Sequence, residues 1–380
     1  MTGSWLTATL ADVATVVGRG IAPRYADHGT VVVVNQRCIR DGRLDLSFTR
    51  RHDSDSRRVG AEKLLRPGDV LVNSTGVGTL GRTAPTKSIE ECTTVDSHVT
   101  IVRPNSTTDG GWLGYALSMA EGEIESMAEG STGQTELSRH RLALLKLAVP
   151  PIVEQRSIAA TLGALDDKIE SNRRAVDLAE QLADQLFAAS AKGTALLTDV
   201  AQLTMGSSPP GNTYNEDGDG LPFYQGVRDF GRRFPGHRVW TSRPIRVAQT
   251  DDTLLSVRAP VGELNRSREI CCIGRGVAAV SSKCPSSMYY ALRSADAIWE
   301  PFQHEGTVFG AINKADLSNA RLSWPLADAL GELEGHLSTI DDKIQSLSKE
   351  IEALSALRDT LLPELLSGRI RVPAPGGVVA

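Results

Sequence analysis

Two long apolar heptad stretches of this chain carry nearly the same five-residue segment, 175 residues apart. The first copy is Leu165-Asp166-Asp167-Lys168-Ile169 and the second is Ile340-Asp341-Asp342-Lys343-Ile344. A proline stands at the same distance upstream of each copy, at Pro150 and at Pro325. Because solenoid repeats recur about every 20 to 50 residues, a spacing this long indicates two copies of a whole domain together with its helix.

Apolar residues recur at alternating intervals of three and four in both stretches, which is the pattern of a coiled-coil seam rather than of a surface helix. Each helix would have about 35 residues and be roughly 50 Å long, so we expect the two to pack as an antiparallel pair within the chain. The seam is expected at Leu162, Leu165, Ile169, Asn172, Leu337, Ile340, Ile344 and Leu347. A lone asparagine in such a seam fixes the register at a cost in stability. Pro363 should kink or end the second helix.

The chain outside the two helices contains a second, fainter repeat. A strand is predicted at Val31–Ile39 and again at Leu221–Val227. Further on, Asp69–Val72 and Asp252–Leu255 predict a second pair of strands, and each runs into a glycine-containing loop. Short strands and turns therefore predominate in both parts of the chain.

These patterns predict a mixed α/β (α+β) chain of two β-rich globular domains, separated by two long helices that pair as an intramolecular antiparallel coiled coil. With 380 residues, the chain has room for two domains of ordinary size. The expected boundaries are residues 1–150 for the first domain, 151–192 for the first helix, 193–325 for the second domain, 326–370 for the second helix and 371–380 for a tail.

The net charge of −5 hides an uneven distribution along the chain. The two helical stretches carry −8 between them, so the rest of the chain carries +3. Residues 228–246 hold six arginines and one acid, and residues 37–66 hold nine basic and five acidic side chains. Such a density of positive charge suits contact with phosphate groups, although a solvated charged surface gives the same pattern.

Several classes of protein have sequence signatures that this chain lacks. There is no Gly-Lys pair for a Walker A loop and no His-Glu-x-x-His for a zinc hydrolase. Neither the Glu-x-Lys triplet of a nuclease nor the Asn-Pro-Pro-aromatic motif of an amino-methyltransferase is present. The five cysteines lack paired spacing, so no metal site and no disulfide framework are expected. No apolar run is long enough to span a bilayer and no export signal is visible, so we expect a cytoplasmic protein that does not enter a membrane.

The segment at the start of the first heptad stretch is the most specific motif of the chain. It reads Leu147-Ala148-Val149-Pro150-Pro151-Ile152-Val153-Glu154-Gln155-Arg156-Ser157-Ile158-Ala159 and leads into the first Leu-Asp-Asp-Lys-Ile. This motif resembles the central conserved region of the specificity subunits of type I restriction-modification systems, and Leu362–Ile370 is similar to the usual ending of that family. The order of domain, helix, domain and helix also agrees, so the resemblance covers nearly the whole chain. The second copy departs from the motif, with Pro325-Leu326-Ala327-Asp328-Ala329 in place of Pro-Pro and Glu-Gln-Arg.

The resemblance implies that the two domains are target recognition domains, each reading one half of a bipartite site in double-stranded DNA, with the helices as a spacer. It also implies a subunit without catalytic activity or a cofactor of its own. Two methyltransferase subunits, and through them motor-nuclease subunits, would dock on the chain and would bind the S-adenosylmethionine, ATP and Mg. The residues that bind these partners would be Pro150, Pro151, Glu154, Gln155, Arg156 and Ile158.

Residues for DNA contact follow from chemistry, since arginine and lysine reach guanine O6 and N7, and asparagine and glutamine reach adenine N6 and N7. The candidates of the first domain are Asn35, Gln36, Arg37, Arg40, Ser74, Thr75 and Gln134. Those of the second domain are Tyr224, Gln225, Arg228, Arg232, Arg233, Arg258, Thr307, Asn313 and Lys314. We expect Arg232 and Arg233 on phosphates and Arg228 on a base. For each candidate, a structural or solvated role stays open.

The two half-sites should differ in sequence. The first domain has Asn35-Gln36-Arg37 at a position comparable to Tyr224-Gln225-Gly226 of the second. A symmetric dimer reads a palindrome because its halves are identical, whereas these halves share only their framework. The target is therefore expected to be asymmetric.

Two other classes of function stay open from the sequence. One is a coiled-coil scaffold protein without DNA binding, which would also contain the heptads. The other is a fused methyltransferase or nuclease with a catalytic site of its own, which the missing motifs disfavour. Binding of duplex DNA, S-adenosylmethionine or a metal by the purified chain would separate these classes.

Overall fold

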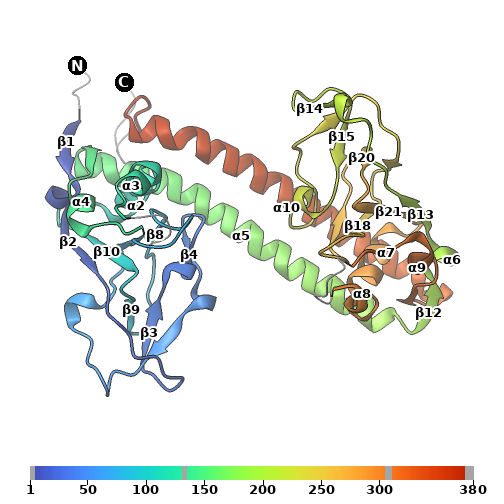
Figure 1. Ribbon diagram of the computed structural model, residues 1–380, viewed down its shortest axis with the longest axis horizontal. Coiled ribbons are helices and arrows are strands. Elements are labelled where there is room, and N and C mark those ends of the chain that lie inside the picture. The colour runs from blue at the N-terminus through green and yellow to red at the C-terminus, as the bar shows by residue number, and fades with distance from the viewer. Residues whose placement is uncertain (1–4, 131–134, 304–309, 373–380) are drawn as a thin grey trace. The chain divides into compact units, whose positions relative to one another are not determined.

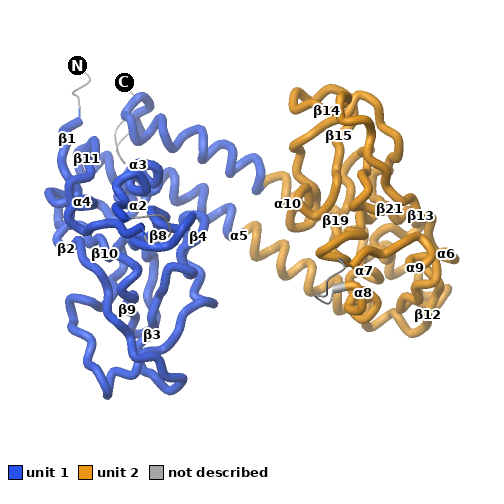
Figure 2. Tube along the Cα trace, in the orientation of Figure 1, with its two compact units in different colours: residues 1–171, 351–380 blue, residues 172–350 orange. Residues whose placement is uncertain are grey.

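The computed structural model describes residues 5–130, 135–303 and 310–372 (Figure 1). The chain divides into two compact units, of which unit 1 comprises residues 1–171 and 351–380 and unit 2 comprises residues 172–350 (Figure 2). Both boundaries fall inside long helices. Each unit therefore holds one globular domain together with half of each helix.

The two long helices of the chain are α5, Ile152–Ser190, and α10, Ala327–Leu366. In unit 1, Ile158 near the start of α5 shares a hydrophobic core with Leu365 near the end of α10. In unit 2, Phe187 near the end of α5 shares a core with Leu337 near the start of α10. The start of each helix thus packs with the end of the other, so the two run antiparallel, as the heptads predicted.

The predicted seam positions lie in the interior. The buried seam residues are Leu162, Ile169, Asn172, Leu337, Ile344 and Leu347. The other two, Leu165 and Ile340, are half-buried. The second helix does not end at Pro363 but continues to Leu366. A proline this close to the end removes only one backbone hydrogen bond from the last turn, which the packed helix tolerates.

Asn172 is the polar member of the seam and is 3% exposed. Its side-chain amide nitrogen has no acceptor among the residues that the structure describes. Because a buried unpaired donor costs about 1–3 kcal/mol, we predict that Asn172→Leu raises the free energy of unfolding by a similar amount. The measurement is the melting temperature by circular dichroism. An unchanged or lower melting temperature would show that the asparagine carries no such cost.

The domain of unit 1 is built on a four-stranded antiparallel sheet in the order β2-β10-β7-β8. Its strands are β2 Ala14–Arg19, β10 Val99–Pro104, β7 Val70–Asn73 and β8 Thr83–Pro85. A second sheet contains β6 Arg50–His52, β3 Val31–Val34 and β9 Thr93–Val95, and in it β3 runs parallel to β9. Two short pairs are β1 Leu6–Thr9 with β11 Lys146–Val149, and β4 Ile39–Arg40 with β5 Arg43–Leu44. The short helices are α1 Leu10–Val13, α2 Gly110–Met119, α3 Glu121–Ser126 and α4 Arg139–Ala143.

The domain of unit 2 has a four-stranded antiparallel sheet in the order β13-β21-β18-β19. Its strands are β13 Gln202–Met205, β21 Val277–Ser281, β18 Thr253–Ser256 and β19 Leu264–Arg266. The second sheet contains β14 Tyr214–Asn215, β16 Trp240–Thr241, β15 Leu221–Tyr224, β20 Cys271–Ile273 and β17 Val247–Ala248. A short pair is β12 Gly193–Leu196 with β22 Arg321–Trp324. The short helices are α6 Leu197–Val200, α7 Pro285–Arg293, α8 Asp296–Gln303 and α9 Lys314–Ser318.

The two domains repeat one topology. The sheet β13-β21-β18-β19 matches β2-β10-β7-β8 strand for strand, and the parallel pair β15–β20 matches β3–β9. The inner strands β7 and β18 are buried along their whole length. Strands covered on both faces are apolar without alternation, which explains why this pair was visible in the sequence to within one residue. The predicted duplication of a domain with its helix is therefore a duplication of the fold.

The first predicted strand of each domain is shorter than expected. β3 ends at Val34, because the Asn35 side chain accepts a hydrogen bond from the Arg37 amide and starts a 3-10 turn. β15 ends at Tyr224, and Gly226 precedes the equivalent turn. Side-chain bonds to nearby backbone compete with the pairing of a strand. The first prediction wrongly extended the strand through this turn to Ile39, and the second extended it to Val227, the first residue of the equivalent turn.

Candidate nucleic-acid interface

Two loops of unit 1 that carry predicted contact residues meet in space. One follows β3 and contains Gln36, and the other follows β7 and contains Thr75. The Thr75 hydroxyl lies 3.2 Å from Oε1 of Gln36 and 2.9 Å from Nδ1 of His98. Gly76 permits this approach, because a Cβ there would lie 2.8 Å from Oε1 of Gln36 and its φ of +100° disfavours other residues. The two loops therefore form one polar site.

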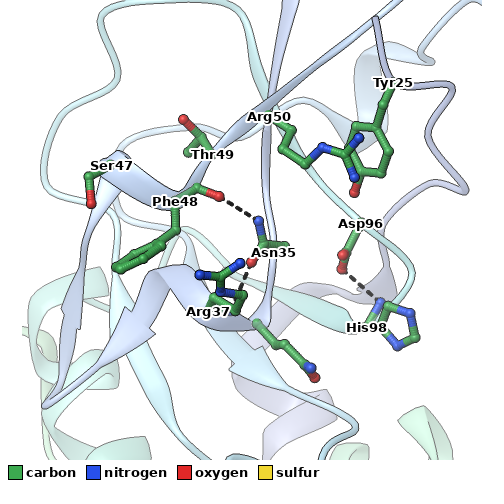
Figure 3. Close-up of a pocket in the computed structure, with 10 residues that line it drawn as sticks. Tyr25, Asn35, Arg37, Ser47, Phe48, Thr49, Arg50, Asp96 and His98 are labelled. Carbon is green, nitrogen blue, oxygen red and sulfur yellow. Dashed lines mark hydrogen bonds between the residues drawn. The ribbon is translucent and has the colours of Figure 1, made fainter. Parts of the chain in front are cut away.

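A surface concavity of about 440 Å³ opens beside these loops (Figure 3). It is lined by Tyr25, Asn35, Gln36, Arg37, Ser47, Phe48, Thr49, Arg50, Asp96 and His98. Asn35, Gln36 and Arg37 were predicted from the sequence. The others come from three further segments that are far apart in the chain, so no local motif marked them. The pair Arg50-Arg51 was visible only as part of a basic stretch.

Three exposed arginines of this region stack on aromatic rings. The guanidinium carbons of Arg37 and Arg40 lie 4.9 and 5.0 Å from the centroid of the Phe48 ring. That of Arg50 lies 3.6 Å from the centroid of Tyr25. None of the three forms an ion pair with a carboxylate in the described part of the chain. Stacking holds a guanidinium in place while most of its N–H groups stay available, which suits contact with bases or phosphates.

The concavity also contains the carboxylate of Asp96, which is buried. Burial raises the pKa of Asp96, and the hydrogen bond from the His98 amide, at 2.9 Å, opposes this rise. Burial likewise raises the pKa of Tyr25, and the charge of Asp96 adds to that effect. Asp96 thus bonds to the backbone and does not neutralise the stacked arginines, so the region keeps its positive charge.

Two predicted residues of unit 1 have structural roles. Asn35 uses both ends of its side chain, since Nδ2 donates to the Phe48 carbonyl at 2.7 Å and Oδ1 accepts from the Arg37 amide at 2.9 Å. Ser74 is fully buried, and its Oγ lies 2.6 Å from the hydroxyl of Thr100. The prediction of a DNA contact at Ser74 is corrected, because a hydroxyl in the interior cannot reach a base.

The loop after the first strand repeats in unit 2. Its 3-10 turn begins after Asn35 in unit 1 and after Gly226 in unit 2. Arg37 and Arg228 are the middle residues of these equivalent turns, and both are exposed. The sequence comparison, which set Asn35 against Tyr224, was therefore out of register by two residues.

The loop after the second strand repeats as well. Thr75 of unit 1 and Arg258 of unit 2 each form an isolated β-bridge, with Glu136 and Ala311 respectively. A half-buried threonine in one domain thus stands where the other has an exposed arginine. The two domains offer different hydrogen-bonding groups at equivalent positions.

The two adjacent arginines that were expected on phosphates pair with carboxylates of the long helices. Arg232 forms an ion pair with Asp177 on α5. Arg233 is 2% exposed and forms an ion pair with Asp341 on α10. The prediction for Arg233 is corrected, because its buried side chain has no access to a phosphate, whereas Arg232 is exposed and its contact with a phosphate stays a prediction.

The other arginines of residues 228–246 divide into two kinds. Arg238 pairs with the buried carboxylate of Asp229 at 2.6 Å. Arg228, Arg243 and Arg246 are exposed. The basic segment therefore presents fewer charges to a ligand than its composition indicates.

The remaining candidates of unit 2 have mixed surroundings. Tyr224 is buried in the core, where burial raises the pKa of its hydroxyl, so its prediction as a DNA contact is corrected. Gln225 and Lys314 are exposed. Asn313 is exposed but caps α9, its Oδ1 accepting from two backbone amides at 2.7 and 3.0 Å. Two further candidates, Gln134 and Thr307, lie outside the described residues.

Over the described ranges, no group of three or more His, Cys, Asp or Glu side chains is arranged to hold a metal ion. Within the same ranges, no helix combines the length and the apolar character needed to cross a bilayer.

Comparison with known proteins places this arrangement in a family. Residues 3–179 match the family model of the type I restriction modification DNA specificity domain, a range that contains the concavity and most of α5. A putative type I restriction enzyme MjaX specificity subunit from Methanocaldococcus jannaschii is 27% identical over 401 residues, which cover 97% of this chain and 94% of that protein. The chain thus contains the type I DNA specificity domain and is similar to a type I specificity subunit over nearly its whole length. Its role is DNA sequence specificity, and such a subunit is not itself catalytic.

A solved structure of a type I S subunit has the same fold. The S subunit of a type I restriction-modification system from M. genitalium is 17% identical with a TM-score of 0.66, and the match covers 96% of this chain and 97% of that one. The HsdS subunit from Thermoanaerobacter tengcongensis is 23% identical with a TM-score of 0.38, over 97% of this chain and 98% of that one. At these identities the likeness concerns the fold alone. The M. genitalium structure, with its higher TM-score, supports the likeness of fold.

The start of α5, where the family resemblance implied partner binding, is partly interior in this specificity subunit. Gln155 is buried, with Oε1 accepting from the Asp109 amide at 2.8 Å and Nε2 donating to the Pro150 carbonyl at 2.8 Å. Ile158 and Pro150 are buried as well. These three residues fix α5 to the domain, so their prediction as a docking surface is corrected.

The rest of that segment is accessible. Pro151 and Arg156 are exposed. Glu154 accepts from the indole Nε1 of Trp5 at 3.1 Å and pairs with Arg371 at 2.7 Å. Of the residues predicted to bind a partner, Pro151 and Arg156 present the accessible surface.

Proposed function

We propose that this specificity subunit reads an asymmetric, bipartite site in double-stranded DNA, one half-site with each domain. The observation that carries the proposal is the pair of equivalent loops with unequal side chains. Arg37 and Arg228 stand at the same place, whereas Thr75 of unit 1 is replaced by Arg258 in unit 2. Equal loops would read equal half-sites and so a palindrome, and unequal loops favour two different half-sites.

Some of the exposed arginines would contact bases and read the sequence, and others would contact phosphates and position the protein on the duplex. Arg37 and Arg228 are placed at the tips of equivalent turns, where a guanidinium can donate to O6 and N7 of guanine in the major groove. Contacts to phosphates fix the register of a protein on the duplex without reading its sequence. The residues proposed for phosphate contact are Arg40, Arg50, Arg243 and Arg246.

The subunit would act in a complex in the cytoplasm, where host DNA is found. Two methyltransferase subunits, and motor-nuclease subunits through them, would dock on it and would bind S-adenosylmethionine, ATP and Mg. An apolar face on α5 supports such docking, because Leu178 and Leu182 lie one helical turn apart and are 65% and 49% exposed. In unit 1, Pro151 just before α5 and Arg156 in its first turns would offer a separate accessible surface.

Single arginine substitutions test the proposal. Arg37→Ala should weaken binding by about 1–3 kcal/mol only when the first half-site is intact, and Arg228→Ala should do the same for the second half-site. The measurement is fluorescence anisotropy of the subunit in complex with its methyltransferase. The duplexes carry both half-sites, either one alone, or neither.

Matched charge deletions away from the loops serve as controls. Lys146 on β11 and Arg321 on β22 occupy equivalent ends of the strand pairs β1–β11 and β12–β22, and both are exposed. Lys146→Ala and Arg321→Ala should leave the preference for each half-site unchanged. If Arg37→Ala and Arg228→Ala weakened binding to every duplex by the same factor, the two arginines would not read bases.

A further inference from the structure

A tyrosine-to-aspartate hydrogen bond occurs in both units with the same separation along the chain. Tyr115 on α2 donates to Asp166 on α5 at 2.6 Å, and Tyr290 on α7 donates to Asp341 on α10 at 3.0 Å. The partners are 51 positions apart in the sequence in each case. Both aspartates are the second residue of the repeated five-residue segment. The motif that reveals the duplication is therefore also the place where each domain is attached to a helix.

The hydrogen bond has the same character in both units. Burial raises the pKa of Tyr115 and of Tyr290, and the partner aspartates contribute to the rise. Both hydroxyls therefore stay protonated and act as donors. A neutral donor to an ionised carboxylate makes a stronger hydrogen bond than a neutral pair does.

In unit 1, the aspartate has a second partner on the other long helix. The Nη1 atom of Arg358, on α10, donates to Asp166 at 3.0 Å. One carboxylate thus connects three elements, namely α2 of the domain, α5 and α10. We call the three residues Tyr115, Asp166 and Arg358 joint 1.

In unit 2, the aspartate receives its further partners from the domain. Arg233 and Arg266 both pair with Asp341, and Arg233 lies 3.5 Å from the centroid of the Tyr289 ring. Among the described residues, the polar partners of Asp341 are thus buried groups of one domain. We call Tyr290, Asp341, Arg233 and Arg266 joint 2.

The same domain also reaches the other helix of unit 2. Arg232 pairs with Asp177, and Arg293 pairs with Asp184 at 3.0 Å, both aspartates lying on α5. In unit 2 the domain is thus tied by directional polar contacts to both long helices, whereas in unit 1 α10 is bonded to Asp166 of α5.

We propose that joints 1 and 2 set the angle at which each recognition domain is held on the helices, and thereby the number of unspecified base pairs that the subunit accepts between its half-sites. This inference rests on the proposed function. Apolar packing favours burial of area but is not directional, so a domain held by packing alone can roll on a helix. A hydrogen bond to one carboxylate oxygen restricts direction as well as distance.

The burial of joint 2 supports a positioning role. Replacing a buried ion pair by apolar residues of similar volume is often neutral or stabilising, so such a pair is weak evidence for stability. Polar groups retained in the interior can instead select one arrangement among several. A duplication that keeps the same tyrosine and aspartate in both copies, while the second partners differ, points to the shared pair as the part that sets the angle.

The test removes one hydroxyl at a time. Tyr115→Phe and Tyr290→Phe are made in the subunit bound to its methyltransferase, and binding is measured on duplexes that keep both half-sites but have gaps longer or shorter by one or two base pairs. We expect the preference for the native gap over its neighbours to fall by roughly five- to tenfold, the factor for the loss of about one hydrogen bond. The base preference within each half-site should stay unchanged.

Tyr214→Phe is the matched control, because its hydroxyl donates to the Pro209 carbonyl at 2.8 Å and belongs to neither joint. It should leave the gap preference as in the wild type. An equal loss of affinity at every gap, or a lower melting temperature with the gap preference intact, would assign the tyrosines a purely structural role and overturn the inference. A wild-type complex that preferred no duplex would overturn the proposed function itself, which is a distinguishable result.

Discussion

Replacing Asp341 with alanine should lower the free energy of unfolding of the chain by about 3–5 kcal/mol. Asp341 pairs with Arg233 and Arg266, and all three side chains are buried. Removing the carboxylate would take the nearest counter-charge from both buried guanidinium groups. Among the described residues, Arg233 would keep only Glu180 at 4.0 Å and Arg266 only Asp251 at 3.4 Å, and the hydroxyl of Tyr290 would lose its acceptor. Chemical denaturation followed by circular dichroism is the measurement.

The repeated segment supplies the control for this prediction. Asp342 is the next residue of α10, has the same charge and is exposed. Asp342→Ala should change the free energy of unfolding by no more than about 0.5 kcal/mol, as most surface substitutions do. If the two variants unfolded at the same denaturant concentration, the buried cluster around Asp341 would not hold unit 2 together.

Exchanging residues 1–150 for the matching domain of another specificity subunit should replace one half-site of the recognised sequence and leave the other unchanged. The loops proposed to read the first half-site lie after β3 and β7, inside this range, and those of the second half-site lie after β15 and β18, outside it. The donor domain should keep a tyrosine in place of Tyr115, because its hydroxyl donates to Asp166 on α5. In place of Asp109 it needs a residue other than proline, because the backbone amide there donates to Gln155 on α5. Long-read sequencing of methylated bases in a host that carries the hybrid gives the result.

The reciprocal exchange of residues 193–325 is the natural partner experiment and should change only the other half-site. A hybrid whose two half-sites both changed would mean that the domains do not read independently. If a hybrid methylated no site at all, its melting temperature would be measured to establish whether the donor domain packs on α5. Only a hybrid that folds can be tested for recognition of its half-site.

The sequence predicted those parts of the fold that depend on local pattern. The heptads placed α5 and α10 to within a few residues and gave their antiparallel pairing. The apolar runs placed β7 and β18, because strands buried on both faces have no polar residues to interrupt them. The strand at Val31 was predicted too long, because the cap formed by Asn35 depends on a side-chain hydrogen bond that hydrophobic pattern does not reveal.

The sequence was less informative about the site, because the partners of several charged and polar side chains lie far away in the sequence. Arg232 and Arg233 lie in an arginine-rich segment, and such a segment looks the same whether its charges face phosphates or carboxylates. The partner of Arg233 is Asp341, 108 residues away. Similarly, Gln155 belongs to the family motif, yet its amide is used inside the subunit to hold the start of α2.

One signal in the sequence could have found joints 1 and 2. Tyr115 and Tyr290 stand 175 residues apart, the same spacing as the two copies of the Asp-Asp-Lys segment. Two polar residues that recur at the same spacing in both copies of a duplication are candidates for a mutual contact, because each domain packs on its helix in the same way. The concavity residues Tyr25 and His98 are not repeated in this way, because the residues 175 positions later are Val200 and Ile273.

The central claim is that one chain reads two different half-sites, and the methylated sequence of the host tests it most directly. Long-read sequencing of a strain that carries this subunit with its methyltransferase, beside a strain that lacks the subunit, should reveal one motif. We predict an asymmetric motif of two unlike half-sites with a gap of fixed length. A palindromic motif, or a gap that varies from site to site, would contradict the account.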